Sequence, residues 1–198
     1  MSGYNGQNYE LYYTLPAAVT KNTYTTIAPI SAIASTGTVP RCIIPANYFS
    51  VIGKSLYFRA RGTIQSAAGT ATFVWTGGLD STAGTLGKTI FATATLTPAT
   101  GTAVFDIEGD IVCQQSAQAN STLACNGTVR VAGTTANAWV TSLSATGGAA
   151  VHSVMQFSNS ITTLDNEVNQ YLELFGTWSA SSGTNSTVLQ QFKVYGEN

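Results

Sequence analysis

Charge is scarce in this chain of 198 residues. Only 9% of the residues are Asp, Glu, Lys or Arg, and the formal net charge is −1. Binding of nucleic acid relies on clustered Lys and Arg that displace counterions, and the sequence has neither a basic patch nor a run of like charge. A freely diffusing monomer usually carries a well-charged surface. We therefore expect no nucleic-acid partner and a surface that largely contacts other protein.

Long apolar runs are missing as well. A bilayer span needs about 20 consecutive apolar residues, and no segment of the sequence approaches that length. Residues 1–10 have neither the basic stretch nor the apolar stretch of a secretory leader. The sequence therefore predicts a protein made in the cytoplasm, with no membrane partner.

Residue types that carry catalysis or bind metals are few. His152 is the single histidine, and it lies in a strand-like run where a structural or interface role is expected. The three cysteines are an odd number without metal-ligand spacing, so buried free thiols are expected, with a Cys113–Cys125 disulfide as the alternative. We predict that the chain is not an enzyme, with no catalytic residues, no metal site and no cofactor.

Asp106, Glu108 and Asp110 are the strongest candidates for a metal site, since alternate positions of a strand share one face. Same-face neighbours lie roughly 7 Å apart, which is too far for one ion unless a loop adds ligands. Ion pairs across a solvated face are the preferred interpretation. The candidate partners on adjacent strands are Arg59, Arg61 and Arg130.

Alternation of apolar and polar residues is the dominant pattern of the chain. Residues 168–195 contain two alternating stretches around a turn of Ser, Gly, Thr and Asn at 179–186, which indicates a hairpin with one face in the core and one toward water. Trp75, Trp139 and Trp178 lie inside such stretches, so core packing is expected, with an exposed platform for carbohydrate as the alternative. Alternation also places these side chains in the core: Leu56, Phe58, Ala60, Ile64, Phe105, Ile107 and Ile111.

Many short strands separated by Gly, Ser, Thr and Pro favour a double-sheet sandwich. We predict an all-β fold, an antiparallel β-sandwich of jelly-roll type, in which residues 17–198 form a single domain and residues 1–16 a short extended N-terminal arm. Besides the closing hairpin, strands are predicted at residues 23–29, 41–44, 55–65, 70–76, 88–97, 102–114, 122–132, 139–143 and 151–157.

The predicted arm contains Tyr4, Tyr9, Tyr12 and Tyr13 among Gly, Asn and Gln. Aromatic side chains on a leader bury a large area for few rotatable bonds, which suits docking on a neighbouring molecule. The alternatives are an arm that packs on its own domain and an arm without order.

Two parts of the chain resemble jelly-roll virion proteins of tailed bacteriophages. The first is the run IPANYF at residues 44–49, followed by Gly53 and the amphipathic strand at 56–64. The second is the closing region at residues 171–174, 178–181 and 185–194. Together they cover about a third of the chain, and the pattern is similar to that of head decoration and tail-associated proteins.

This resemblance implies a homotrimeric jelly roll that is made in the host cytoplasm and fixed on the capsid surface of the virion. There it would act as a decoration, or cement, protein that bridges subunits of the major capsid protein, and many weak contacts on a lattice would add up through avidity. Tyr4, Tyr9, Tyr12 and Tyr13 would contact the shell. The alternative is the head domain of a tail fibre or spike that binds a host receptor or glycan.

Overall fold

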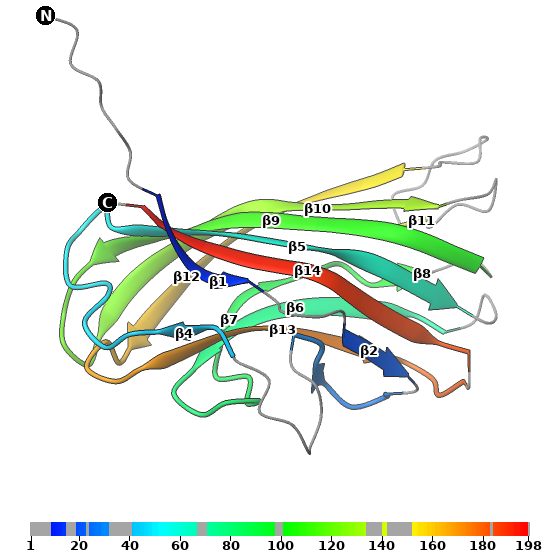
Figure 1. The fold of residues 1–198 in the computed structure, drawn as a ribbon, viewed down its shortest axis with the longest axis horizontal. Helices are drawn as coiled ribbons and strands as arrows, with labels where there is room; N and C mark the ends of the chain where they lie inside the picture. The colour runs from blue at the N-terminus through cyan, green and yellow to red at the C-terminus, as the bar shows by residue number, and fades with distance from the viewer. Residues whose placement is uncertain are drawn as a thin grey trace, which may run out of the picture.

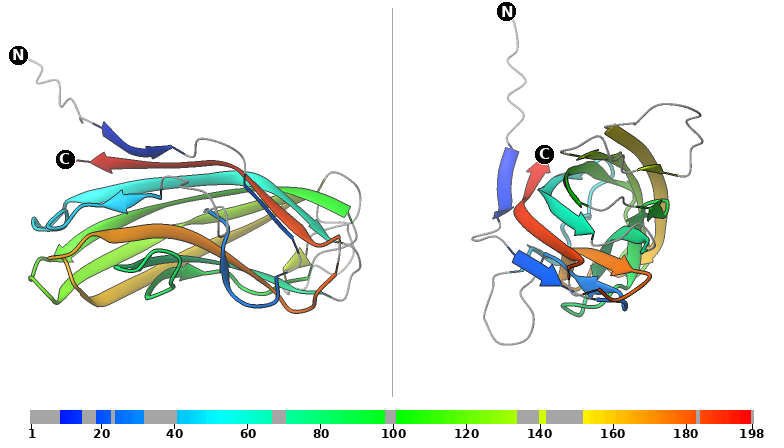
Figure 2. Two further views of the ribbon diagram at one scale, coloured as in Figure 1. Left: turned by 60° about the horizontal axis from the view of Figure 1, so that its bottom comes forward. Right: turned by 90° about the vertical axis from the view of Figure 1, so that its right-hand side faces the viewer.

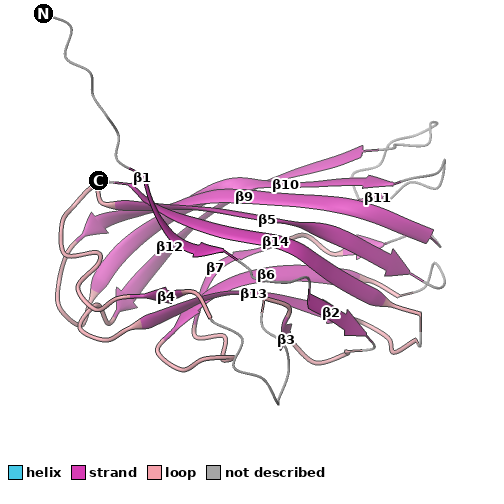
Figure 3. Ribbon diagram, in the orientation of Figure 1, coloured by secondary structure: helices cyan, strands magenta, loops and turns pink. Residues whose placement is uncertain are grey.

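The computed structural model of the chain describes residues 9–14, 19–22, 24–31, 41–66, 71–97, 101–133, 140–141, 152–182 and 184–197. Every regular element in these ranges is a β-strand (Figure 3). No helix in this part of the chain has the length and apolarity to cross a bilayer. The all-β prediction is confirmed, as expected for a sequence rich in β-branched residues and poor in strong helix formers.

The strands form two antiparallel sheets that run along the long axis of the molecule and enclose the core (Figures 1 and 2). Sheet A has the order β1-β14-β5-β9-β10-β12, and β2 also pairs with β14. Its strands are β1 (Tyr9–Thr14), β2 (Val19–Asn22), β5 (Ser55–Ser66), β9 (Gly101–Gln115), β10 (Ser121–Gly133), β12 (His152–Leu164) and β14 (Ser186–Glu197).

Sheet B has the order β11-β8-β6-β13-β3, and β4 pairs with β13 while β7 pairs with β6. Its strands are β3 (Ala28–Pro29), β4 (Ile43–Ile44), β6 (Phe73–Asp80), β7 (Lys88–Ala92), β8 (Leu96–Thr97), β11 (Val140–Thr141) and β13 (Gln170–Trp178).

The connections between the sheets are those of a jelly roll. The chain crosses from one sheet to the other between β2 and β3, β4 and β5, β5 and β6, β8 and β9, and β13 and β14. It also crosses to sheet B for β11 between β10 and β12, and again between β12 and β13. As a result β2 pairs with β14 and β3 pairs with β13. On the other side of the roll, β5 pairs with β9, and β6 pairs with β7 and β8. This rolled antiparallel ribbon confirms the predicted topology. β10 and β12 widen sheet A beyond β9 before the chain crosses to β13.

One continuous apolar cluster fills the space between the sheets. Trp75, Trp178 and Phe73 are fully buried. The ring centroid of Phe73 lies 4.8 Å from that of Trp75 and 4.8 Å from that of Trp178. Trp75 and Trp178 are thus core residues, as predicted, and Trp139 lies outside the described residues. The side chains that alternation placed inward on β5 and β9 are all buried.

Several strands differ from their predicted bounds. β12 continues to Leu164, seven residues beyond the expected end, through a polar stretch that lacks apolar alternation. Residues 88–97 form two strands, β7 and β8. Of the described residues in the expected strand at 23–29, only Ala28–Pro29 form a strand. β2 was not predicted, since its sequence VTKN lacks a second apolar residue to mark a face.

The closing hairpin differs from the prediction in one respect, because both faces of β13 are buried. Leu172 and Leu174 face the core, but Glu173 and Phe175 on the opposite face are also only 3% and 1% exposed. The loop at residues 81–87 covers this outer face: a methyl group on Gly78 would lie 2.3 Å from Leu86 and 3.3 Å from Phe175. β13 is therefore buried on both faces over residues 172–176.

The predicted arm is in part a strand of sheet A. β1 pairs with the end of β14, from Tyr9 opposite Glu197 to Thr14 opposite Lys193. This part of the chain thus lies along its own domain, while residues 1–8 and 15–16 of the predicted arm lie outside the described residues. The assignment of residues 17–198 to a single domain stays a prediction.

A pair of glycines makes room for an aromatic stack between the sheets. Gly109 and Gly127 lie directly opposite each other on β9 and β10. The Phe157 ring packs beside them and stacks on Phe91 with centroids 4.5 Å apart. A methyl group on Gly127 would lie 2.4 Å from Cζ of Phe157 and 2.2 Å from the carbonyl oxygen of Glu108. These positions leave no space for a side chain.

We expect Gly127→Ala to lower the free energy of unfolding by about 2 kcal/mol, because the methyl group overfills the packed site and displaces backbone. Denaturant unfolding monitored by tryptophan fluorescence measures this change. The neighbouring exposed position provides the control, and Asn126→Ala should stay within about 0.5 kcal/mol of the parent protein. Equal stability of the two variants would contradict the packing argument.

Candidate interaction surfaces

The outer face of sheet A carries a network of ion pairs that we call the charge ladder. Its members come from β5, β9 and β10, the three central strands of the sheet, and their register places them on adjacent rungs. The charge ladder consists of Arg59, Arg61, Asp106, Glu108 and Arg130.

Diagonal pairs connect the ladder. Arg59 lies opposite Glu108 but donates from Nε and Nη2 to both carboxylate oxygens of Asp106, at 2.9 and 2.5 Å. Arg61 donates to Asp106 from Nε at 3.1 Å. Arg130 lies opposite Asp106 but pairs with Glu108 through Nη2 at 2.7 Å. The predicted arginine partners are thus all confirmed.

These contacts decide the protonation of the ladder. Partial burial tends to raise the pKa of Asp106, but the hydrogen bonds and charges of Arg59 and Arg61 outweigh it and lower that pKa. The hydrogen bond to Asp106 raises the pKa of the Arg59 guanidinium in turn. Around Tyr57, which donates to Glu108, burial and the nearby carboxylate raise the phenol pKa. Asp106 and Arg59 are therefore both ionised at neutral pH.

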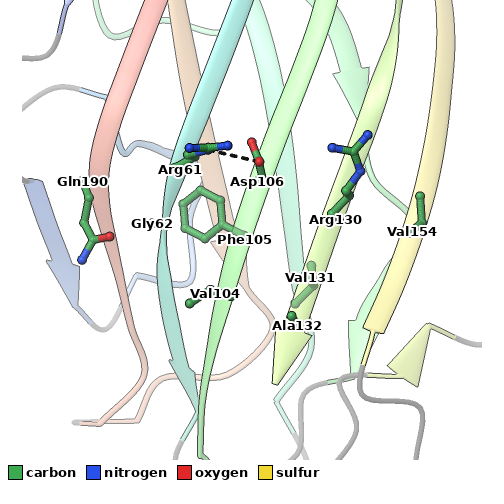
Figure 4. A pocket seen from close by; sticks show the side chains of 10 residues that line it. All are labelled: Arg61, Gly62, Val104, Phe105, Asp106, Arg130, Val131, Ala132, Val154 and Gln190. Carbon is green, nitrogen blue, oxygen red and sulfur yellow. Dashed lines mark hydrogen bonds and ion pairs between the residues drawn. The ribbon is translucent and has the colours of Figure 1, made fainter. Parts of the chain in front are cut away.

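A shallow hollow of about 450 Å³ lies beside the charge ladder (Figure 4). Arg61 and Arg130 flank it on two strands that are separated by β9, and Asp106 lies between them. Val104 and Val154 on its rim are 46% and 58% exposed. The hollow thus combines two half-exposed guanidinium groups with an aliphatic surface, which is the composition of a protein contact site.

The loop end is a second surface, formed by the loops at residues 45–54, 116–120 and 165–169. The buried side chain of Asn166 accepts a hydrogen bond from the Phe49 amide at 3.1 Å, and its backbone carbonyl accepts one from Asn47 at 2.6 Å. The Asn166 amide donates to Gln118 at 2.9 Å. Asn47 adopts a left-handed backbone with φ of 63°. The three loops are thus tied into one structure.

Aliphatic side chains project from the loop end. Val51 and Ile52 are 61% and 67% exposed, and Val168 is 40% exposed. The backbone on either side of Val51 and Ile52 is held in place. The Gly53 amide donates to the Cys113 carbonyl at 2.8 Å, and the Ser50 carbonyl accepts from the Ser116 hydroxyl at 2.8 Å. Exposed aliphatic groups on a well-bonded loop make this end of the molecule a candidate contact surface.

The tyrosines predicted to contact the shell lie partly outside the described residues. Tyr4 falls in residues 1–8, and for Tyr9, Tyr12 and Tyr13 the structure describes the backbone in β1 but not the side chains. Tyr9 pairs with Glu197, and Glu197 pairs with Ser55, which directly follows the loop at 45–54. The N-terminal segment therefore enters the sheet at the loop end, and its contact with a shell stays a prediction.

Two features were not predicted from the sequence. One is the exposed pair Val51 and Ile52, which we call the aliphatic tip, and the other is the buried acid Glu173. The tip has a sequence signal, because Val51-Ile52 stands between Ser50 and Gly53, where a turn normally carries polar residues. Glu173 pairs with Arg41 and accepts a hydrogen bond from the Gly84 amide at 2.6 Å. No sequence signal distinguishes it from a solvated strand residue, because its cover comes from the distant loop at 81–87.

The thiols are buried and free, as predicted. Burial raises the pKa of Cys125 to about 12, and burial together with the charge of Glu173 raises that of Cys42. A thiol with a raised pKa is a poor nucleophile. Among the described residues, no group of three or more His, Cys, Asp and Glu side chains is placed to hold a metal ion.

No protein-family model matches the chain, and no curated protein matches it in sequence. Solved structures give loose similarities. The CBM2 module of the evolved Dit of Lactobacillus casei BL23 phage J-1 is 12% identical, with 97% of each chain covered and a TM-score of 0.36. Arcelin-5, a lectin-like defense protein from Phaseolus vulgaris, is 9% identical over 95% of this chain and 98% of that chain, with a TM-score of 0.32.

The structure of infectious bursal disease virus, Gx strain, is 11% identical, with 96% of this chain and 33% of that chain covered and a TM-score of 0.27. A phage module and a virus structure are thus among the similar folds. Superpositions this loose assign no function to the chain, so its function has to be argued from its own surfaces.

The charge ladder predicts a specific pH dependence of stability. Because the pKa of Asp106 is lower in the folded state than its unfolded value of about 3.9, its ionised form stabilises the fold above about pH 4, and this contribution is lost as the pH falls through the folded value. Asp106→Asn should therefore lose less unfolding free energy than the parent protein between about pH 5 and pH 2. Denaturant unfolding over this range measures the difference.

Arg59→Gln serves as the second variant, since it removes the cation that lowers the pKa and should flatten the same profile. Parallel stability profiles for the parent protein and both variants would show that the ladder contributes nothing to folding.

Proposed function

We propose that the chain is a structural protein of a tailed-phage virion, and that it decorates the capsid as a homotrimer bound to the major capsid protein. The observation that carries this proposal is the loop end: a rigid, hydrogen-bonded surface that exposes Val51 and Ile52 at the end of the sheet where the N-terminal segment enters. A decoration protein acts through buried area, and this surface provides it.

The chemistry of the remaining residues supports a binding role over a catalytic one. The conspicuous carboxylates, Asp106 and Glu108, are neutralised by arginines on the outer face of a sheet. The thiols lie in the core with raised pKa values. Neutralised carboxylates and buried thiols are both expected of a protein that acts by binding another molecule. The sequence resemblance to phage virion proteins supports a phage particle as the place of this contact.

The runner-up function is the head domain of a tail fibre or spike that binds a host receptor or glycan. The hollow beside the charge ladder favours it, since arginine and carboxylate groups over an aliphatic surface can also bind a sugar. Quantitative mass spectrometry of purified virions separates the two functions. A decoration protein should be present at a copy number comparable with that of the major capsid protein, whereas a spike should be far less abundant.

Two changes should each weaken binding to bare capsids. One is the deletion of residues 1–8, which removes Tyr4 but leaves β1 paired with β14. The other is Ile52→Asp, which places a charge on the aliphatic tip and should weaken binding at least tenfold. Cosedimentation of the purified protein with capsids measures both effects, and light scattering checks that the oligomer is intact.

Ile27→Asp is the matched control, because Ile27 is 46% exposed in the turn before β3 and away from the loop end. It should bind like the parent protein. Retained binding by the deletion and by Ile52→Asp would refute the assignment of this surface to the shell.

A further inference from the structure

We infer that the hollow beside the charge ladder is the self-association site of the protein, and that the acidic loop at residues 165–168 of a second copy occupies it. This inference deepens the proposed oligomer of the virion protein and rests on that proposal. It identifies the two surfaces that meet and the side chains that pair.

The hollow has the charge needed to attract an acidic group. The ladder contains three arginines and two carboxylates, so it carries a surplus of positive charge. Arg61 binds Asp106 through Nε, and Arg130 binds Glu108 through Nη2. The side chains of these two arginines are 47% and 49% exposed. Each thus keeps part of its donor fork at the hollow, where it can bind a carboxylate.

The loop at 165–168 has the complementary chemistry. Asp165 and Glu167 are exposed, and neither forms an ion pair among the described residues. The Asp165 side chain accepts a hydrogen bond from the Glu167 amide at 2.9 Å, which fixes the turn. Val168 follows with 40% of its surface exposed. The two carboxylates and one aliphatic group of the loop thus match the two guanidinium groups and the aliphatic rim of the hollow.

The loop cannot reach the hollow of its own chain. Val154 on the hollow's rim lies near the start of β12, and Asp165 directly follows the end of that strand. At about 3.3 Å per residue, the two sites lie about 35 Å apart along the sheet. Val154 lies in β12, and hydrogen bonds of Asn166 to Asn47, Phe49 and Gln118 hold the loop at the opposite end, so the acidic loop that fills the hollow belongs to a second copy.

A contact between two different surfaces of identical chains is head-to-tail, and repetition closes it into a ring when the rotation allows. Such a ring agrees with the proposed trimer. The ring contact and the proposed shell contact both lie at the loop end but use different side chains, Asp165, Glu167 and Val168 for the ring and Val51 and Ile52 for the shell.

Charge reversal tests the inference. Asp165→Lys with Glu167→Lys should raise the dissociation constant of the oligomer at least tenfold, and so should Arg61→Glu with Arg130→Glu. The protein that carries all four substitutions should regain the oligomer, because the charges match again with opposite sign. Light scattering coupled to size-exclusion chromatography measures the mass as the protein is diluted. Restoration by the combined variant shows that the single reversals act at the contact and not through misfolding.

Gln118→Lys is the control, since it adds a positive charge to an exposed position of the same loop end but outside the acidic loop. It should leave the mass unchanged. Oligomers that resist the loop reversal while the protein still binds capsids would overturn the inference and leave the proposed function intact. A parent protein that is a monomer and does not bind capsids would overturn both.

Discussion

The antiparallel register of β5, β9 and β10 is the constraint on which both faces of sheet A depend. Side chains alternate along each strand, so one register sends Phe58, Phe105 and Val129 into the core and aligns the charge ladder outside. A shift by one residue would bury the charges and expose the apolar rings. The diagonal ion pairs fit only this register as well. Core packing and surface charge therefore specify the same alignment, and the hollow is a consequence of it.

Alternation explains why this part of the molecule was predictable from the sequence. The inward set of β5 and β9, the outward carboxylates and their arginine partners all follow from a period of two and from strand adjacency. The jelly-roll class follows from the number and spacing of strands. None of these inferences needs knowledge of a distant loop. Local pattern was sufficient wherever one face of a strand meets the core and the other meets solvent.

The prediction failed where a distant segment decides the environment. Glu173 alternates like a solvated residue, but the loop at 81–87 and Arg41 bury it. The second half of β12 is polar and gave no signal, although its backbone pairs with β10 through Leu164. The hollow and the loop end are likewise products of topology, because each combines residues from strands or loops that are far apart in sequence. Such neighbours are set by the fold and not by local pattern.

Because the chain has few charged residues, each of them has a large effect on which ion pairs can form. All four arginines of the chain are in ion pairs, one with the buried Glu173 and three in the charge ladder. Asp165 and Glu167 are two residues apart and exposed on a chain with only nine acids. On a densely charged surface such groups would compete with many similar ones, and a contact between them would specify little. Among the described residues few charged groups compete with these, so the proposed contact between the acidic loop and the hollow would select both the partner and its orientation.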